Sequence, residues 1–214
     1  MMKVCNQVII RHVGSLVIAI TSLLLVSPSV TAQDAKKGAK KPVAKKPVNS
    51  AMKPPQVQAG LPNVLLIGDS ISIGYTVMVR DALAGQANVF RPLTNCGPTT
   101  KGVESVDQWI GDRKWDVIHF NFGLHDLKYM GPNGENLADP KAATSNPQVP
   151  IDEYVANLRK IATRLKATGA TVIWRETTPV PDGAKGRVVG DSKKYNEAAA
   201  KVMKELGGIE TDPM

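Results

Sequence analysis

The alternation of apolar and polar positions predicts a domain in which strands and helices follow one another. Asn63–Ile67 and Ala170–Arg175 are apolar runs of strand length, whereas the segment from Ile151 repeats apolar residues at helical spacing. That helical stripe consists of Ile151, Tyr154, Leu158, Ile161 and Leu165. Strands that alternate with helices tend to pair in parallel and to be covered on both faces. The pattern therefore predicts the α/β class, with a three-layer α/β/α sandwich around a parallel sheet.

The same pattern gives bounds for each element. The expected strands are Asn63–Ile67, Asn88–Leu93, Trp115–Phe122 and Ala170–Arg175, with a further strand that starts at Ile209. The expected helices run from Ile73 to about Gly85, along Val103, Val106 and Ile110, from Ile151 to Gly169, and from the N-cap Asp191 to Leu206. The expected loops are Thr94–Gly102, Gly123–Gln148 and Glu176–Gly190, and loops as long as the second are often functional.

Residues 1–32 have the composition of a secretory signal peptide. Lys3 and Arg11 precede the mostly apolar segment Val13–Val26, and the stretch that follows ends in the small residue Ala32. An uncleaved membrane anchor is the alternative, but the apolar segment is short for a membrane span. We therefore expect an exported protein, either periplasmic, in the cell envelope or extracellular.

Residues 33–59 are rich in Lys, Pro and Ala, and they predict a disordered linker before a domain at 60–214. Residues 1–58 hold nine of the 27 Lys and Arg residues and one of the 19 Asp and Glu residues, so residues 59–214 hold 18 of each and are neutral. The basic charge therefore belongs to the N-terminal segment, which argues against nucleic acid binding by the domain. The lysines either contact an anionic polymer of the envelope or form a solvated spacer.

Candidate chemistry lies in the loops that follow the expected strands. Ser70 comes after the first strand, and Cys96-Gly97, His125-Asp126 and Thr177-Thr178 come after the next three. Because the carboxyl ends of parallel strands share one edge of the sheet, these residues are expected to converge there. A serine at the start of a helix exposes its hydroxyl and leaves its N–H free for an oxyanion, although a simple capping serine is the other interpretation.

Three segments resemble the motifs of the SGNH (GDSL-type) hydrolases: "IGDSIS" at 67–72, "NCGPTT" at 95–100 and "NFGLHD" at 121–126. The resemblance covers about Asn63 to Ile209. It implies a flavodoxin-like sheet and ester hydrolysis through a serine, three oxyanion donors and a late Asp-x-x-His pair. Carried over to this chain, Ser70 is the catalytic nucleophile and donates its N–H to the oxyanion, and Gly97 is the second oxyanion donor.

The third oxyanion donor of that family is an asparagine, but this chain has His125 in its place. A neutral imidazole has one N–H to donate, so His125 can fill the position, and its titration near neutral pH would then affect activity. A loop histidine bound to backbone is the alternative. Asp69 and Asp126 are expected to support the loops rather than to react.

The sequence supplies no evident base for Ser70. Its three histidines are His12, in the predicted signal peptide, His119 and His125. Asp116 and His119 do form an Asp-x-x-His sequence, but residues three apart on a strand point to opposite faces, so we expect His119 to pack in the sheet. One interpretation makes His125 the base. The simpler one is C-terminal truncation: the last strand, the Asp-x-x-His loop and the final helix would be missing, which leaves a sheet edge unpaired.

These features predict an exported SGNH-type serine esterase for an acyl ester, with a carbohydrate acetyl ester as one candidate substrate. It needs no cofactor, and His119, His125 and Asp126 do not have the spacing of a common metal site. The alternatives are a non-catalytic exported binding domain of the same fold and the product of a truncated gene. Leu127–Asn146 and Thr177–Gly190 are the loops expected to shape the pocket.

Overall fold

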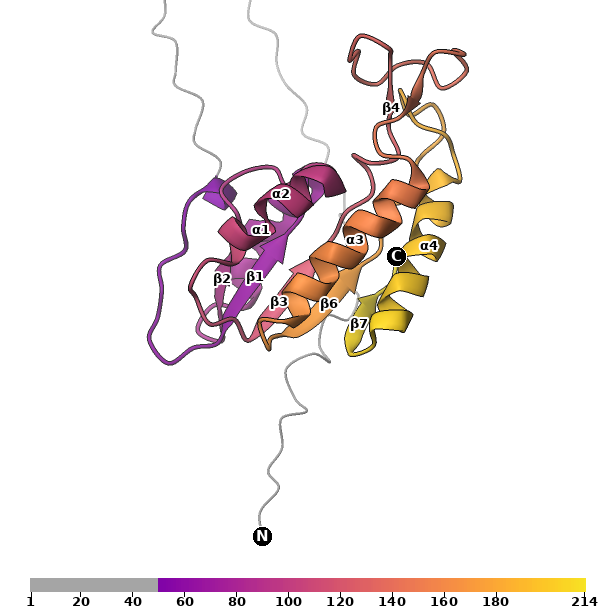
Figure 1. Cartoon of the computed structure of the whole chain (residues 1–214). Coiled ribbons are helices and arrows are strands. Elements are labelled where there is room, and N and C mark those ends of the chain that lie inside the picture. Colours follow the sequence, from indigo (N-terminus) through magenta and orange to yellow (C-terminus); the bar gives the residue numbers. More distant parts are fainter. Residues whose placement is uncertain (1–49) are drawn as a thin grey trace, which may run out of the picture. The chain divides into compact units, whose positions relative to one another are not determined.

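The computed structural model describes residues 50–214, so the predicted signal peptide and the first part of the predicted linker lie outside the described residues. Five parallel strands form one sheet in the order β2-β1-β3-β6-β7 (Figure 1). The strands are β1 (Asn63–Ile67), β2 (Asn88–Phe90), β3 (Val117–Phe120), β6 (Thr171–Arg175) and β7 (Ile209–Asp212). The central parallel sheet that the sequence predicts is confirmed.

Helices lie on both faces of this sheet. The α-helices of the described part are α1 (Ser70–Ala82), α2 (Thr99–Ile110), α3 (Ile151–Lys166) and α4 (Asp191–Leu206). Apolar residues of α2, α3 and α4 join Ile67, Phe120 and Trp174 in one buried core. On the opposite face, α1 packs against β1 and β2, and Tyr75 meets His119 edge-on there. Within residues 50–214, no helix combines the length and the apolar character that crossing a membrane requires.

The bounds of two elements differ from expectation for local reasons. α1 begins at Ser70 rather than Ile73, because the Asp69 carboxylate caps it and accepts a hydrogen bond of 2.9 Å from the Ile71 N–H. β2 ends at Phe90 rather than Leu93, and the following segment includes Pro92, which has no N–H for a strand ladder.

Two helix starts also differ. α2 begins at Thr99, inside the segment expected to be a loop, directly after Pro98. At α4 the N-cap is Gly190, with a φ of 89°, and Asp191 is the first helical residue rather than the cap. The Asp191 carboxylate instead accepts a hydrogen bond from Lys194 Nζ at 2.8 Å, an interaction within the first turn.

β7 is formed and pairs in parallel with β6. Thr211 and Asp212 belong to this strand, although the polar composition of residues 211–214 does not predict one. The prediction that a strand, a loop and a helix are missing after this point is untested and stays a prediction.

The α1 face of the sheet is only partly covered by the described residues. α1 packs against β1 and β2, whereas residues that β3, β6 and β7 turn to this side are partly or fully exposed. Among them, His119, Arg175 and Asp212 are partly exposed and polar. This side of the sheet therefore carries charged groups rather than a continuous apolar surface.

The last part of the predicted linker packs on the domain. Ala51 is fully buried, and Arg80 Nη1 donates a hydrogen bond of 3.0 Å to the Ser50 carbonyl. Gln58 and Asn88 exchange hydrogen bonds of 2.8 and 3.0 Å. The prediction of a disordered linker does not hold for these residues, because their partners lie 30 residues later and composition does not reveal them.

Two long loops project from the carboxyl edge of the sheet, one after β3 and one after β6 (Figure 1). The first contains a short antiparallel pair, β4 (Tyr129–Met130) with β5 (Asn146–Pro147). The Tyr129 N–H donates a hydrogen bond of 2.8 Å to the Gly186 carbonyl in the second loop. The two loops that were expected to shape a pocket are therefore joined.

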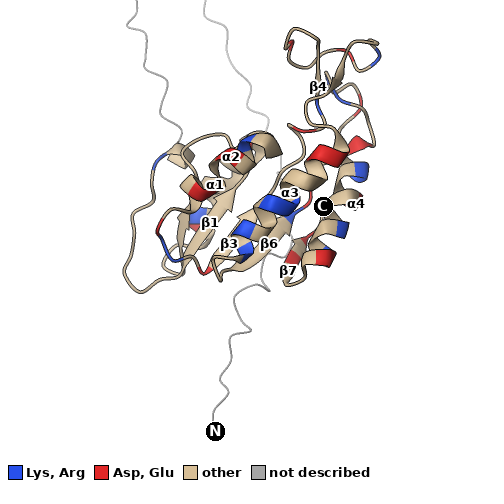
Figure 2. Cartoon of the chain, in the orientation of Figure 1, with Lys and Arg blue, Asp and Glu red and all other residues tan. Residues whose placement is uncertain are grey.

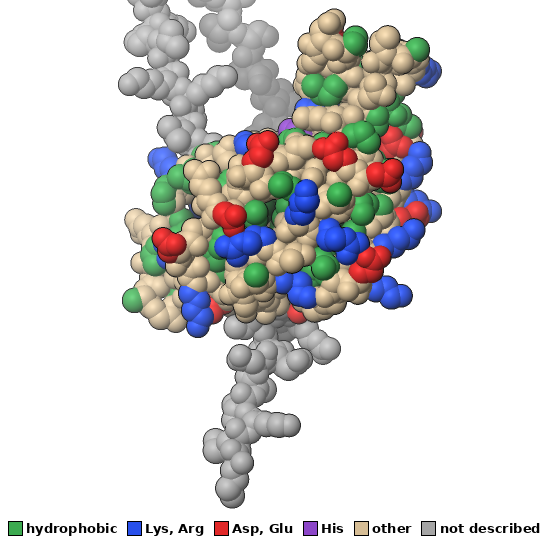
Figure 3. Space-filling model, in the orientation of Figure 1, with side chains coloured by type: hydrophobic (Ala, Val, Ile, Leu, Met, Phe, Trp, Pro, Cys, Tyr) green, Lys and Arg blue, Asp and Glu red, His purple; other side chains and the backbone are tan. Residues whose placement is uncertain are grey.

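Charges of both signs are interspersed over α2, α3 and α4 (Figures 2 and 3). Arg159 pairs with Glu205 between α3 and α4, and Arg164 pairs with Asp107 between α3 and α2. The face shown has no single-sign region, as the neutral charge balance of the domain leads one to expect.

Candidate active site

Ser70 lies at the carboxyl end of β1, as the first residue of α1. The side chain is exposed. Among residues 50–214, neither its hydroxyl nor its N–H has a hydrogen-bond partner. The first N–H groups of a helix carry partial positive charge and point outward. Ser70 thus combines a free hydroxyl with a free N–H at a site that favours negative charge.

The turn before Ser70 has no room for a side chain at Gly68. A Cβ added there would lie 2.9 Å from Ser72 Cβ and 3.7 Å from the Asn121 carbonyl oxygen. The Gly68 carbonyl also accepts a hydrogen bond of 3.3 Å from the Cys96 N–H. The turn that carries Ser70 is therefore in direct contact with the loop that carries Gly97.

Arg91 forms hydrogen bonds with both the turn before Ser70 and the loop that carries Gly97. Its side chain is 5% exposed, and all five of its N–H groups donate hydrogen bonds. The acceptors are Pro92 O at 3.1 Å, Ser72 Oγ at 3.0 Å, Thr76 Oγ1 at 3.1 Å, Gly68 O at 3.3 Å and Thr94 O at 3.2 Å. None of these acceptors is a carboxylate, so backbone and hydroxyl dipoles balance the buried charge. Arg91 was not singled out from the sequence, since no local motif marks it.

The Gly97 N–H is already hydrogen-bonded, whereas an oxyanion donor requires a free N–H. The φ of Gly97 is 64°, and its N–H donates a hydrogen bond of 2.9 Å to Asn95 Oδ1. Lys101 Nζ donates to the Asn95 carbonyl at 2.7 Å and braces the same loop. The Asn95 side chain must turn away before the Gly97 N–H can reach a substrate oxygen.

His125 lies near Asp69, the neighbour of Ser70. Burial lowers the pKa of its imidazole, Lys128, Arg187 and Lys101 lower it further, and the Asp69 carboxylate opposes them. The ring nitrogens have no hydrogen-bond partner within the described part of the chain, so His125 is not a histidine fastened to backbone. A neutral imidazole offers one N–H donor and one acceptor nitrogen.

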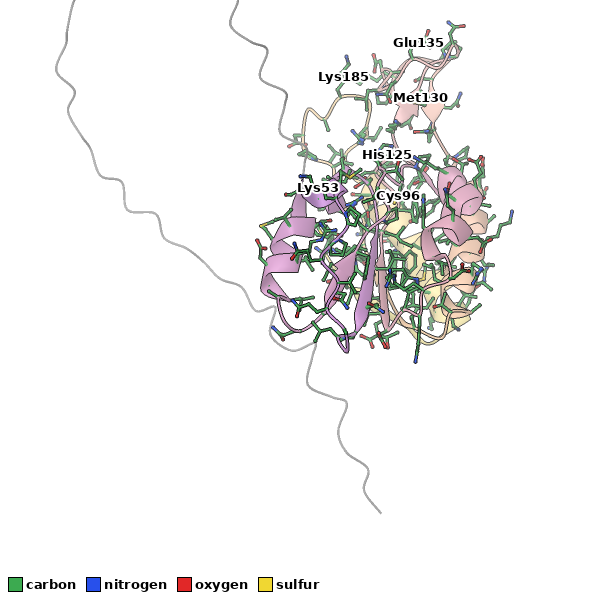
Figure 4. The ribbon with its side chains drawn as sticks, turned by 90° about the vertical axis from the view of Figure 1, so that its left-hand side faces the viewer. Lys53, Cys96, His125, Met130, Glu135 and Lys185 are labelled. Atoms are coloured by element: carbon green, nitrogen blue, oxygen red, sulfur yellow. The ribbon has the colours of Figure 1, made fainter. Side chains whose placement is uncertain are left out.

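Figure 4 shows how His125 is placed. Cys96 lies beneath it, and the loops that carry Met130 and Lys185 rise above it. With the Gly68–Cys96 contact, the electrostatic effect of Asp69 on His125 and the packing of Thr177 against Gly123, all four expected loops meet at one edge of the sheet. Thr177 follows β6 and is buried, with its N–H bound to Asn196 Oδ1 at 2.8 Å.

Asp126 fastens the His125 loop to the start of α2. Its Oδ1 accepts hydrogen bonds from the Thr99 N–H at 2.8 Å and the Thr99 hydroxyl at 2.5 Å. The residue is fully buried, and Oδ2 has no partner within residues 50–214. Burial raises the pKa of this carboxyl to about 7, against the hydrogen bonds from Thr99. The clamp fixes His125 relative to Gly97, because Thr99 lies two residues after that glycine.

The buried Asp126 carboxyl should make the free energy of unfolding depend on pH. Its pKa is near 3.8 in the unfolded chain and about 7 in the folded one, so between these values the folded state binds more protons. The free energy of unfolding should therefore decrease from about pH 4 to pH 7, by on the order of 4 kcal/mol from this group, and then level off. Asp126→Asn removes the titration. In urea unfolding, the stability of the wild type relative to this variant is expected to decrease over that range.

The control for this measurement is Asp152→Asn, at an exposed position in the first turn of α3. Its difference from the wild type should show no comparable decrease between pH 4 and pH 7. A wild-type stability that keeps a constant offset from Asp126→Asn over the range would contradict the assignment.

His119 and Asp212 form a pair that the sequence did not predict. His119 Nε2 lies 3.2 Å from Asp212 Oδ2, and Arg175 Nη1 donates to Asp212 Oδ1 at 2.6 Å. Burial lowers the pKa of His119, and Asp212 opposes this effect. Asp116 instead accepts a hydrogen bond of 2.8 Å from the Asn63 N–H, so it is not the partner of His119.

Asp212 lies where the resemblance to the SGNH hydrolases leads us to expect the aspartate of an Asp-x-x-His pair. It ends β7, and the resemblance places the family's Asp-x-x-His after the last strand. The sequence did not single out Asp212, because an aspartate without a histidine three residues later does not form the motif. No side chain of the described residues is hydrogen-bonded to Ser70 Oγ.

Several solved structures are similar to this chain. An acetyl xylan esterase, AlAXEase, matches 71% of this chain and 76% of its own, with 13% identity and a TM-score of 0.55. A GDSL-like lipase from Bacteroides thetaiotaomicron matches 79% of this chain and 71% of its own, with 13% identity and a TM-score of 0.51. A lipase/acylhydrolase from Enterococcus faecalis matches 71% of this chain and 75% of its own, with 16% identity and a TM-score of 0.51. No family model and no curated protein sequence matches the chain.

Proposed function

We propose that this chain, which has the SGNH hydrolase fold, hydrolyses an acyl ester through a covalent intermediate on Ser70. The observation that supports the proposal is the state of Ser70. Its hydroxyl and its N–H are both free, at the start of α1, on the edge of the sheet where His125 also lies. A nucleophile and donors for the developing negative charge are the two requirements of acyl transfer.

In the proposed reaction, Ser70 Oγ attacks the acyl carbon, and the carbonyl oxygen becomes an oxyanion. The Ser70 N–H and the His125 N–H donate to this oxyanion, and the Gly97 N–H joins them once Asn95 Oδ1 has turned away. The tetrahedral intermediate expels the alcohol and leaves an acyl-serine. Water then attacks the acyl-serine and restores the Ser70 hydroxyl.

The proton of Ser70 needs an acceptor. We assign Asp212, at the end of β7, to the aspartate of the family's Asp-x-x-His pair, whose histidine is the third residue after that aspartate. Such a histidine accepts the serine proton and then gives it to the departing alcohol. With that assignment, His125 serves as an oxyanion donor and not as the base.

Two substitutions of His125 separate these roles. His125→Asn keeps a side-chain N–H and restores the residue type that the resemblance expects, whereas His125→Ala removes the donor. If His125 stabilises the oxyanion, kcat for 4-nitrophenyl acetate should decrease about 100- to 1,000-fold in His125→Ala and less than about tenfold in His125→Asn. Both variants should unfold at urea concentrations close to that of the wild type, because the ring has no partner to lose.

Equal and large losses of kcat in both variants would contradict the donor role and would identify His125 as the base. The dependence of kcat on pH provides a second measurement. Burial lowers the pKa of His125 from 6.5, so a titration below that pH that disappears in His125→Asn while kcat is retained reports protonation of a donor.

A carbohydrate acetyl ester is the substrate that we propose, supported by the acetyl xylan esterase among the similar structures. We also propose that the protein is exported and that the lysines of residues 33–49 contact an anionic envelope polymer. N-terminal sequencing of the protein from the cell envelope and the medium tests export. A first residue of Gln33 is expected, and an intact Met1 would contradict cleavage after Ala32.

A further inference from the structure

An open cavity of about 730 Å³ lies between the two long loops that follow β3 and β6. The two loops are in direct contact at this cavity, and this contact holds its walls in place. A Cβ added at Gly186 would lie 2.3 Å from Leu137 Cα. Leu137 itself has a φ of 58°, a region that leucine rarely adopts and that its surroundings must stabilise.

The lining of this cavity combines apolar surface with an excess of positive charge. Leu137, Pro140, Val188 and Val189 contribute apolar groups, and the charged residues are Asp139, Lys141, Lys185 and Arg187. The Asp139 carboxylate accepts a hydrogen bond of 2.9 Å from the Lys141 N–H, so the one negative charge is already engaged in its own turn. Such a lining suits a partly apolar molecule with a negatively charged group.

Arg187 connects the cavity to the residues of the proposed reaction. Its Nε and Nη2 donate hydrogen bonds of 3.2 and 3.0 Å to the carbonyl of Leu124, the residue before His125. Burial lowers the pKa of Arg187 and Asp69 opposes this effect, while Arg187 lowers the pKa of His125, so the guanidinium lies within electrostatic reach of both residues. Its Nη1 has no hydrogen-bond partner within residues 50–214.

We propose that Arg187 and this cavity form a subsite for a carboxylate on the substrate, so that the enzyme prefers an ester with a negative charge near the ester bond. The inference rests on the proposed esterase function and adds a substrate class to it. Two N–H groups of Arg187 hold the guanidinium on the Leu124 carbonyl, and Nη1 is free to donate to the carboxylate. Lys185 and Lys141 add a weaker attraction over a longer distance.

The alternative for Arg187 is a purely structural brace of the His125 loop. A brace would affect neutral and anionic esters alike, whereas a subsite affects the anionic ester alone. The ratio of kcat/KM for a matched pair of esters therefore separates the two. 4-Acetoxybenzoate and its methyl ester place the charge on the alcohol side. 4-Nitrophenyl hydrogen succinate and 4-nitrophenyl butyrate place it on the acyl side.

One of the two pairs carries its charge on the side of the ester that faces the cavity. For that pair, kcat/KM of the wild type should be about tenfold higher for the anionic ester than for the neutral one, and the preference should decrease at high salt. Arg187→Gln should remove the preference, because kcat/KM decreases more for the anionic ester than for the neutral one. The matched control is Arg159→Gln, an arginine paired with Glu205 between α3 and α4, and it should keep the preference. Equal rates within both pairs, a preference that survives in Arg187→Gln, or an equal loss for both esters would overturn the subsite.

A binding measurement keeps this test separate from that of the esterase function. 4-Acetamidobenzoate has an amide in place of the ester, and its methyl ester is the neutral control. Calorimetric titration of the chain should detect 4-acetamidobenzoate, with affinity lost in Arg187→Gln and kept in Arg159→Gln. That result without turnover of any ester would support the subsite and contradict the esterase. Turnover without a preference for the anionic ester would support the esterase function and contradict the subsite. Absence of both turnover and binding would contradict both proposals.

Discussion

Ser70→Ala is expected to reduce strongly the hydrolysis of 4-nitrophenyl acetate and to leave only the residual rate that oxyanion donors and substrate binding support. The substitution removes the hydroxyl that forms the covalent intermediate but keeps the backbone N–H and the helix start. Oxyanion donors and substrate binding alone support rates about 10³- to 10⁴-fold above water in serine hydrolases, so Ser70→Ala, which keeps both, should retain a rate above that in buffer. Removing the serine of a complete triad lowers kcat by about 10⁶-fold, so a smaller loss is expected here, where no base is identified among the described residues.

Added imidazole sharpens this measurement, because it can accept the serine proton in place of a histidine side chain. After subtraction of the reaction with imidazole alone, imidazole should accelerate the wild type and leave Ser70→Ala unchanged. Ser105→Ala, on α2, is the control and should behave as the wild type. An undiminished rate in Ser70→Ala would show that the hydrolysis does not pass through this serine.

Arg91→Met is expected to lower both stability and activity. The change leaves three backbone carbonyls and two hydroxyls without the donor that Arg91 supplies. Hydrogen bonds to a charged group contribute about 1.5–3 kcal/mol, and an unsatisfied buried acceptor costs about 1–3 kcal/mol. We expect the free energy of unfolding in urea to decrease by about 3 kcal/mol or more, and kcat to decrease because the Gly68 and Thr94 segments are no longer joined.

Two variants show whether the effect is specific to this network. Arg91→Lys keeps the charge with at most three donors, so it should recover part of both losses. Arg80→Met is the matched control. Arg80 also donates to backbone carbonyls, those of Val89 and Ser50, but it makes no contact with the turn before Ser70. It should lose less stability than Arg91→Met, because it gives up fewer hydrogen bonds, and it should keep the wild-type kcat. Equal effects of Arg80→Met and Arg91→Met on kcat would contradict a positioning role for Arg91.

The sequence carried enough information for the fold, because that information is local. The apolar run of β1 and the helical stripe of α3 each lie within one element, and their periodicity shows which side is buried. Alternation of strands and helices then determines a parallel sheet. The bounds were less secure where one side chain decides them, as Asp69 does at α1 and Gly190 does at α4.

The parts of the site that the sequence did not reveal all depend on contacts between distant segments. In the sequence, Arg91 is simply a residue at the end of a strand. Its acceptors on α1 and in the next loop are evident only from the structure. His119 and Asp212 lie 93 residues apart. The occupied N–H of Gly97 is local, but its partner Asn95 has several possible side-chain conformations, and the sequence does not select among them.

The non-catalytic alternative makes a different prediction from the same residues. A domain that only binds would retain its ligand in Ser70→Ala and show no turnover in either form. The Asn95 side chain on the Gly97 N–H is the feature most compatible with that alternative, since it occupies one oxyanion donor. An esterase requires this hydrogen bond to open when a substrate carbonyl competes for the N–H.

The most direct test of the proposed function is mass spectrometry of the chain after reaction with diethyl 4-nitrophenyl phosphate, which phosphorylates an activated serine. We expect one diethylphosphoryl group per chain, located by peptide sequencing on Ser70, absent from Ser70→Ala and formed faster when imidazole is added. An unmodified Ser70, or a modification that persists in Ser70→Ala, would contradict a nucleophile at this position.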